Sequence, residues 1–163
     1  MTERRADLRE ATPGKTTSST LDEDNPLVSV IMPNFNKAEY LRIAITSLLR
    51  QTLTNFELII VDDASNDDSV QVINEFLSQD HRLRILKHGT KEGVSATRND
   101  GIMLARGPLV TFLDSDDIYA PTKLEAQYLL LVKQQQPSVC YCGHYQIDAE
   151  GRFIQSYDEE FKS

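Results

Sequence analysis

The segment Phe56-Glu57-Leu58-Ile59-Ile60-Val61-Asp62-Asp63 decides the fold of this 163-residue chain. Its apolar, β-branched run ends in two carboxylates, which is typical of a strand that is buried on both faces of a parallel sheet. An earlier segment, Val28-Ser29-Val30-Ile31-Met32, has the same character and ends at Pro33 and Asn34. Apolar residues at helical spacing follow each segment, so the sequence predicts alternating strands and helices.

The alternation of strand and helix occurs four times. We expect helices over residues 38–51, 70–77, 94–106 and 121–132, and further strands over residues 82–86 and 109–113. Crossovers of helical length favour a mainly parallel sheet with helices on both faces, an α/β fold. The last segment alternates in polarity over residues 139–146 and precedes a turn at residues 148–151, which predicts a half-exposed strand and a hairpin.

The composition narrows the function classes. With 17 basic and 25 acidic residues the net charge is −8, which argues against a broad basic face for nucleic acid. The two cysteines, Cys140 and Cys142, are too close in sequence to join distant parts of a fold, so a reducing, cytoplasmic compartment is expected. No apolar run approaches the roughly 20 residues of a membrane span. Residues 1–25 carry little apolar content and are interpreted as a disordered tail.

Polar residues follow three of the predicted strands, at the edge of the sheet where α/β proteins bind ligands. Carboxylates gathered there need a cation or hydrogen-bond donors to offset their repulsion. Oxygen ligands favour a hard cation such as Mg²⁺ or Mn²⁺ together with substrate phosphates. The alternative is that the acids at residues 114–117 only cap a helix or form Asx turns.

Four ordered motifs resemble family 2 glycosyltransferases of the GT-A fold. They are Val28 to Asn36, Phe56 to Asp67, Gly93-Val94-Ser95-Ala96-Thr97-Arg98-Asn99-Asp100-Gly101, and Phe112-Leu113-Asp114-Ser115-Asp116-Asp117, which is similar to the family's DxD motif. The resemblance implies a GT-A domain over residues 26–163 that lacks much of the acceptor-binding half. It also implies transfer of a sugar from a nucleoside diphosphate to an acceptor hydroxyl, with inversion at the anomeric carbon.

The resemblance also implies roles for residues of the nucleotide site. Pro33, Asn34 and Asn36 would lie beside the nucleoside. Asp63, and with less support Asp62, would accept from the uracil ring or the ribose, which favours a UDP-sugar donor. One of these two acids is expected to form an Asx turn with Ser65 instead.

The remaining implied roles concern the diphosphate and the metal. Arg98 would contact the base or the diphosphate, because its fixed charge and fork of donors suit either; its alternative is a surface ion pair. Asp114 would reach the ribose or the metal, Asp116 would ligate Mn²⁺ or Mg²⁺, and Asp117 would share either role. A bound divalent cation would stabilise the charge that develops on the leaving diphosphate.

The resemblance leaves the acceptor side open. It implies a glycan or lipid-linked acceptor, a role in cell-surface polysaccharide synthesis, and peripheral contact with the inner face of the membrane as an option. No general base is identified, since the acids at residues 158–160 match no family motif and suit a solvated run. The rival interpretation is a nucleotide-sugar-binding module that does not transfer sugar by itself.

Two further groups of residues receive no functional role. Cys140, Cys142 and His144 resemble a soft-metal site only superficially, because zinc sites usually separate their ligand pairs by a turn and need a fourth ligand. His81 and His88 flank a predicted strand, and no acid paired with them in the sequence suggests catalysis.

Overall fold

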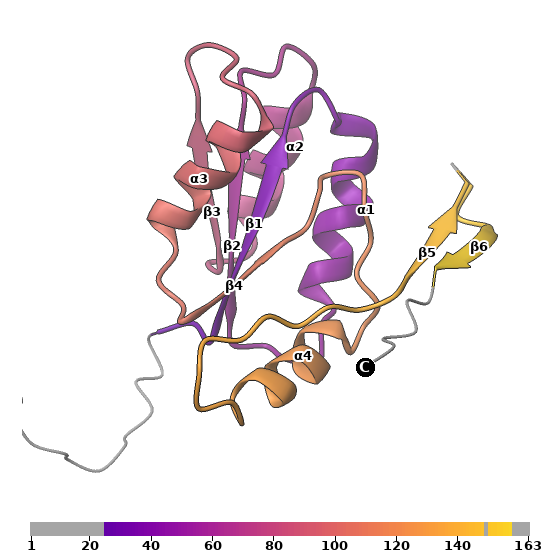
Figure 1. Ribbon diagram of the computed structural model, residues 1–163. Coiled ribbons are helices and arrows are strands. Elements are labelled where there is room, and N and C mark those ends of the chain that lie inside the picture. Colours follow the sequence, from indigo (N-terminus) through magenta and orange to yellow (C-terminus); the bar gives the residue numbers. More distant parts are fainter. Residues whose placement is uncertain (1–24, 149, 158–163) are drawn as a thin grey trace, which may run out of the picture.

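A four-stranded parallel sheet forms the centre of the computed structural model, which describes residues 25–148 and 150–157 (Figure 1). The strands are ordered β3-β2-β1-β4 across the sheet. Their bounds are Val28–Asn34 for β1, Phe56–Asp62 for β2, Leu83–Lys87 for β3 and Leu109–Phe112 for β4. The predicted parallel sheet is confirmed, whereas the predicted tail lies outside the described residues except for Asn25.

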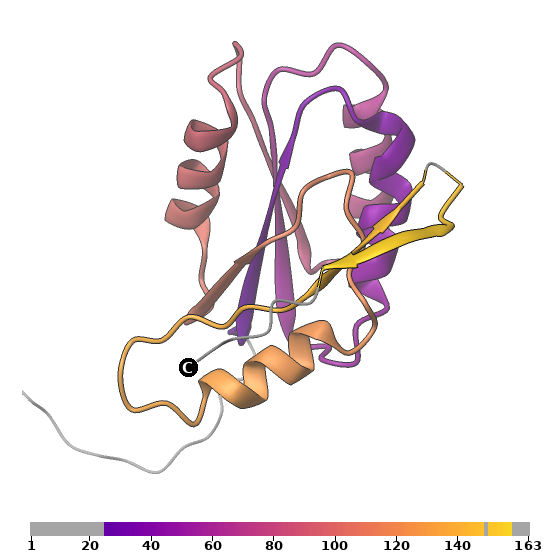
Figure 2. The ribbon, with the colours of Figure 1, turned by 45° about the vertical axis from the view of Figure 1, so that its right-hand side comes forward.

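Helices cover both faces of the sheet, as predicted. Helices α1 (Ala38–Leu49) and α2 (Ser69–Leu77) pack on one face, and α3 (Val94–Leu104) lies on the other (Figures 1 and 2). The apolar stripe of α1 is fully buried against the sheet through Leu41, Ile45 and Leu48. This stripe is the amphipathic pattern that the sequence predicts for a helix on a sheet.

The two central strands are buried along their whole length because both of their faces are covered. Val30 and Met32 of β1 belong to the core cluster with α1 and α2, and Ile31 points to the opposite face. There α3 approaches so closely that a Cβ on Gly101 would lie 2.3 Å from Cγ2 of Ile31. The glycine thus permits the close packing of α3 on β1.

The order of the strands places a topological switch point at the end of β1. This strand pairs with β2 on one side, where Asn34 is opposite Asp62, and with β4 on the other, where Ile31 is opposite Phe112. The chain passes from β1 to β2 and β3 on one side of β1, and then crosses to β4 on the other side. Open α/β sheets form ligand crevices at such points.

The C-terminal part corrects three expectations. The strand expected over residues 139–146 is limited to β5 (His144–Ile147), which pairs with β6 (Phe153–Tyr157). The hairpin is confirmed, but the residues of both strands are all exposed instead of alternating with buried ones. Alternating polarity alone made no strand of residues 139–143, because they have no partner strand among the described residues. The helix expected from Pro121 begins later, as α4 (Lys123–Leu131), and Val132 of its predicted face is exposed.

Candidate functional site

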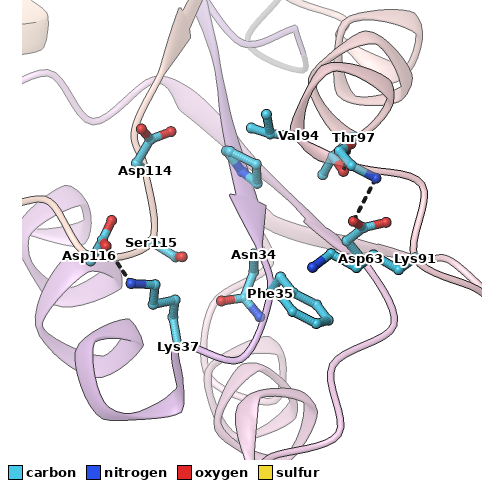
Figure 3. Close-up of a pocket in the computed structure, with 12 residues that line it drawn as sticks. Asn34, Phe35, Lys37, Asp63, Lys91, Val94, Thr97, Asp114, Ser115 and Asp116 are labelled. Carbon is cyan, nitrogen blue, oxygen red and sulfur yellow. Dashed lines mark hydrogen bonds and ion pairs between the residues drawn. The ribbon is translucent and has the colours of Figure 1, made fainter.

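A cleft of about 350 Å³ opens at the carboxyl ends of β1, β2 and β4. Figure 3 shows Asn34 and Phe35 at its centre, with Asp114 and Asp116 on one side and Asp63 and Lys91 on the other. The residues of the sequence-predicted site that line it are Pro33, Asn34, Asp63, Asp114 and Asp116. Those that are not part of its lining are Asn36, Asp62, Arg98 and Asp117. The switch point of the sheet thus brings residues from all four motifs into one cleft, the third motif through Gly93, Val94 and Thr97.

Asp63 is a buried carboxylate that is held by several donors. Its Oδ1 accepts from the Glu92 N–H at 2.7 Å and lies 2.8 Å from Nδ1 of His88, while Oδ2 accepts from the Gly93 N–H at 2.8 Å. Burial raises the pKa of Asp63, but these donors outweigh it and hold the pKa below its usual value. Asp63 is therefore an ionised, fixed acceptor in the wall of the cleft.

Asp62 has a different environment from its neighbour. Its Oδ1 accepts from the Asn34 amide at 2.8 Å and from the Ser65 hydroxyl at 2.6 Å, and its Oδ2 accepts from the Ser65 N–H at 3.0 Å. These bonds form the Asx turn that was expected for one of the two acids. Asn36 joins the same loop, because its side-chain oxygen accepts from the N–H of Asn66 at 2.8 Å.

The side chain of Asn34 is 2% exposed and leaves one polar atom without a partner. Its amide nitrogen donates to Asp62 and Ser65, but its oxygen has no hydrogen bond within the described part of the chain. Buried polar atoms normally have a partner. An unpaired oxygen in the wall of a cleft is suited to a ligand donor.

The acidic loop after β4 pairs with two basic side chains from other elements. Asp116 lies 2.8 Å from the Lys37 ammonium, and Asp114 accepts from Arg98 of α3 at 2.7 Å. The side chains of Asp114 and Asp116 remain 43% and 42% exposed. Desolvation, together with the charges of Asp114 and Asp116, raises the pKa of Asp117 above its usual value. This loop thus carries more negative charge than its own partners neutralise.

The donor set of the loop fits a hard divalent cation. Its ligand atoms are carboxylate oxygens, and no histidine or cysteine lines the cleft among the described residues. Mg²⁺ and Mn²⁺ prefer oxygen ligands, and Mg²⁺ is usually bound through one or two carboxylates plus phosphates. Desolvation is the main cause of the raised pKa of Asp117, and such a cation would relieve the repulsion from Asp114 and Asp116 that adds to it.

Several residues at the cleft were not predicted from the sequence. Lys37 and Lys91 line it, and the Lys91 ammonium lies 3.7 Å from the centre of the Phe35 ring. The sequence showed no acid paired with His88, whereas the fold places its ring between Asp63 and Asp100. The polar side-chain atoms of His88, Glu92 and Asp100 lie within 4.8 Å of one another, so acidic groups surround the ring. The sequence signal that could have pointed to the two lysines is their position beside a motif: Lys37 directly follows the motif that ends at Asn36, and Lys91 lies two residues before the motif that begins at Gly93.

A parallel α/β sheet with an acidic cleft at its switch point belongs to the class of open α/β proteins that bind ligands beyond the carboxyl ends of their strands. The chain belongs to glycosyl transferase family 2, whose family model matches residues 29–162. The GT-A fold predicted for it is confirmed by solved glycosyltransferase structures of the same architecture.

Curated relatives agree with this assignment. An uncharacterized glycosyltransferase of Haemophilus influenzae is 42% identical over 130 residues, which cover 79% of this chain and 51% of the relative. The Escherichia coli protein WfgD, named UDP-Glc:alpha-D-GlcNAc-diphosphoundecaprenol beta-1,3-glucosyltransferase, is 38% identical over 124 residues, covering 76% and 47%. The chain thus spans about half the length of these relatives.

Two solved structures illustrate the shared fold. The S. aureus protein TarS in complex with UDP superimposes with a TM-score of 0.61 at 29% identity, covering 65% of this chain and 32% of TarS. The mannosyltransferase PcManGT of Pyrobaculum calidifontis, in complex with GDP-Man and Mn²⁺, also gives 0.61, at 20% identity, covering 74% and 36%. None of the helices in residues 25–148 and 150–157 has the length and apolarity needed to cross a membrane.

Proposed function

We propose that this domain binds a nucleoside-diphosphate sugar, with a UDP-sugar favoured, as the donor site of an inverting glycosyltransferase. The observation that carries the proposal is the cleft itself. It combines a fixed carboxylate, Asp63, and the unpaired oxygen of Asn34 on one wall with the acidic loop on the other. A ligand with a polar base at one end and a metal-bound diphosphate at the other matches this division.

The nucleoside is assigned to the end of the cleft between β1 and β2. Asp63 accepts from the uracil ring or ribose, and the Asn34 oxygen accepts from another donor of the nucleoside. Backbone groups of Pro33 lie beside it, while Asn36 and Asp62 shape the loop that carries these contacts. The TarS structure in complex with UDP, and the name of WfgD, which includes UDP-Glc, support uracil over guanine.

The diphosphate is assigned to the side of the acidic loop. Asp114, Asp116 and Asp117 would hold Mn²⁺ or Mg²⁺, which supplies Lewis-acid stabilisation of the leaving diphosphate. Lys37 and Arg98, which pair with Asp116 and Asp114 in the free protein, exchange these carboxylates for phosphate oxygens. The positive charges of Lys37 and Arg98 are then neutralised whether or not the donor is bound.

The acceptor is a hydroxyl of a glycan or of a lipid-linked sugar, used in cell-surface polysaccharide synthesis. The name of WfgD, which includes a diphosphoundecaprenol-linked sugar, supports a lipid-linked acceptor. Such an acceptor would be met at the inner face of the membrane by peripheral contact. The general base that accepts the proton of this hydroxyl is not assigned to a residue.

Calorimetry with UDP and GDP, each with and without Mn²⁺, tests the donor assignment. We expect Mn²⁺-dependent binding of UDP that exceeds binding of GDP, and an Asp114→Asn variant that weakens it by about tenfold or more. The exposed Asp68→Asn substitution is the matched control, since it removes one carboxylate outside the cleft. Failure of both nucleotides to bind, with or without Mn²⁺, would refute the proposal. Donor binding without transfer to any acceptor would support the binding-module alternative.

A further inference from the structure

His88 lies behind the wall of the cleft and joins three elements. It follows β3 directly, its Nδ1 lies 2.8 Å from Oδ1 of Asp63 at the end of β2, and its Nε2 lies 3.0 Å from Oδ2 of Asp100 on α3. The imidazole is only 6% exposed. His88 itself is not part of the lining of the cleft, so it would act on a ligand through Asp63.

The geometry determines which atoms donate. Both oxygens of Asp63 already accept backbone N–H bonds, from Glu92 and Gly93, so Asp63 is held as an ionised acceptor. Asp100 is 44% exposed and is an acceptor when ionised. A neutral imidazole has one N–H and could donate to only one of the two carboxylates. Both short contacts are satisfied together only when His88 is an imidazolium.

We propose that His88 is a positioning residue for the donor site, which as an imidazolium holds the Asp63 carboxylate and thereby couples donor affinity to pH. The inference rests on the proposed function, in which Asp63 contacts the nucleoside. Loss of the Nδ1 proton breaks the bond to Asp63 directly, and loss of the Nε2 proton breaks the bond to Asp100 that fixes the ring against α3, so in either case the anchor of Asp63 is weakened.

The charges around His88 determine the sign of the pH dependence. The groups that face it are Asp63 from β2, Glu92 from the loop before α3, and Asp100 from α3. The hydrogen bond to Asp63 raises the pKa of His88, and the acidic neighbours outweigh the opposing effect of burial. A raised pKa means that the anchor is complete at low pH and is lost as the pH rises through that pKa. Donor affinity therefore falls as the pH rises.

The experiment measures the Kd for UDP by calorimetry between about pH 6.5 and about pH 9.5, a range that covers a raised histidine pKa. Excess Mg²⁺ serves as the cation, because it prefers oxygen and leaves imidazole free. We expect the Kd of the wild type to rise by about three- to tenfold over this range, the effect of one lost charge-assisted bond next to the ligand. Proton–nitrogen NMR correlation spectra of the histidine rings follow the His88 proton directly in the same samples.

Variants separate positioning from a purely structural role. His88→Gln keeps one donor but does not titrate in this range, so its Kd should lack the contribution of His88 and change with pH only as far as UDP itself titrates. Asp100→Asn removes one acidic neighbour at a half-exposed position, so the midpoint of both the Kd and the NMR titration should move to lower pH. His81→Gln, on an exposed turn outside the cleft, should reproduce the wild-type curve.

The outcomes distinguish the inference from the function on which it rests. UDP binding with a Kd that does not change with pH, or a His88 ring that is neutral across the range, would overturn the positioning role and leave the donor site intact. Absence of UDP binding at every pH would overturn the proposed function, and this inference with it. If His88→Gln does not fold, the shift of the titration midpoint in Asp100→Asn and the NMR titration of the wild type still test the positioning role of His88.

Discussion

Acidic side chains lie at both ends of the central sheet, but their surroundings differ. At the amino end, Glu57 of β2 is 1% exposed and accepts from the hydroxyl of Ser29 and the backbone N–H of Arg106, both at 2.7 Å. The guanidinium groups of Arg84 and Arg106 complete its shell at 2.9 and 3.0 Å. At the carboxyl end, the half-exposed Asp114 and Asp116 each pair with one basic side chain.

Carboxylates thus have different surroundings at the two ends: the fold itself pairs Glu57 fully, whereas it leaves Asp114 and Asp116 partly open. The charge of Glu57 is neutralised entirely by the protein itself, so removal of the carboxylate leaves two cations and two donors without their partner. The acidic loop at the other end has partners that a ligand can displace. Substitutions at the two ends should therefore affect different measurements.

The largest effect is expected from Glu57→Ala. The Ser29 hydroxyl and the Arg106 N–H each lose their acceptor, at about 1–3 kcal/mol apiece, whereas the side chains of Arg84 and Arg106 are 37% and 51% exposed and can be solvated. We therefore expect the free energy of unfolding in urea to fall by about 2–4 kcal/mol. Glu75→Ala is the matched control, because Glu75 forms a half-exposed ion pair with Arg42, and such pairs contribute about 0–1 kcal/mol. Equal losses in the two variants would show that the amino end is not a special structural site.

Asp116→Asn should show the opposite behaviour. The free energy of unfolding should change by less than about 1 kcal/mol, because the pair with Lys37 is 41% and 42% exposed. The Mn²⁺-dependent affinity for UDP should fall by about 10- to 100-fold, as expected for loss of a charged ligand. Calorimetry and urea unfolding on the same preparation give both values. A loss of stability without a loss of affinity would make the two ends alike.

Local patterns predicted most of the fold. The strands β1 and β2 follow from continuous apolar runs, and α1 follows from its stripe, because these signals depend on neighbours in sequence. The strand expected over residues 139–146 was only partly formed, since a strand also needs a partner to pair with, and polarity alone does not supply one.

The candidate site was less predictable, because its contacts join residues far apart in sequence. The motifs drew attention to Asp62 and Asp63 together, yet only the packing of Ser65 against one and of the Glu92–Gly93 turn against the other separates their environments. Glu57 stood in an apolar run with no sign of its two arginine partners, and His88 gave no sign of its acids.

The pH dependence of stability offers a third test of the two ends. Although desolvation raises the pKa of Glu57, its bonds to Ser29, Arg106 and Arg84 lower that pKa overall below its usual value. A lowered pKa adds stability that is present above the unfolded-state pKa and is lost as the pH falls through the folded-state pKa. In urea unfolding, the gap between the wild type and Glu57→Gln should therefore shrink as the solution is made acidic. A gap that stays constant would mean that the charge of Glu57 does not matter.

The smallest effect is expected from Lys37→Ala, measured as binding of Mn²⁺ in the absence of nucleotide. The Lys37 ammonium lies 2.8 Å from Asp116, and this contact raises the pKa of Lys37, so the lysine competes with a metal ion for the same carboxylate. Removal of a half-exposed competitor worth about 0–1 kcal/mol should tighten Mn²⁺ binding by up to about fivefold. Lys87→Ala, at the exposed end of β3, is the control and should leave Mn²⁺ binding unchanged. Weaker Mn²⁺ binding in Lys37→Ala would instead mean that the lysine organises the acidic loop, and the carboxyl end would then depend on its own partner as Glu57 does.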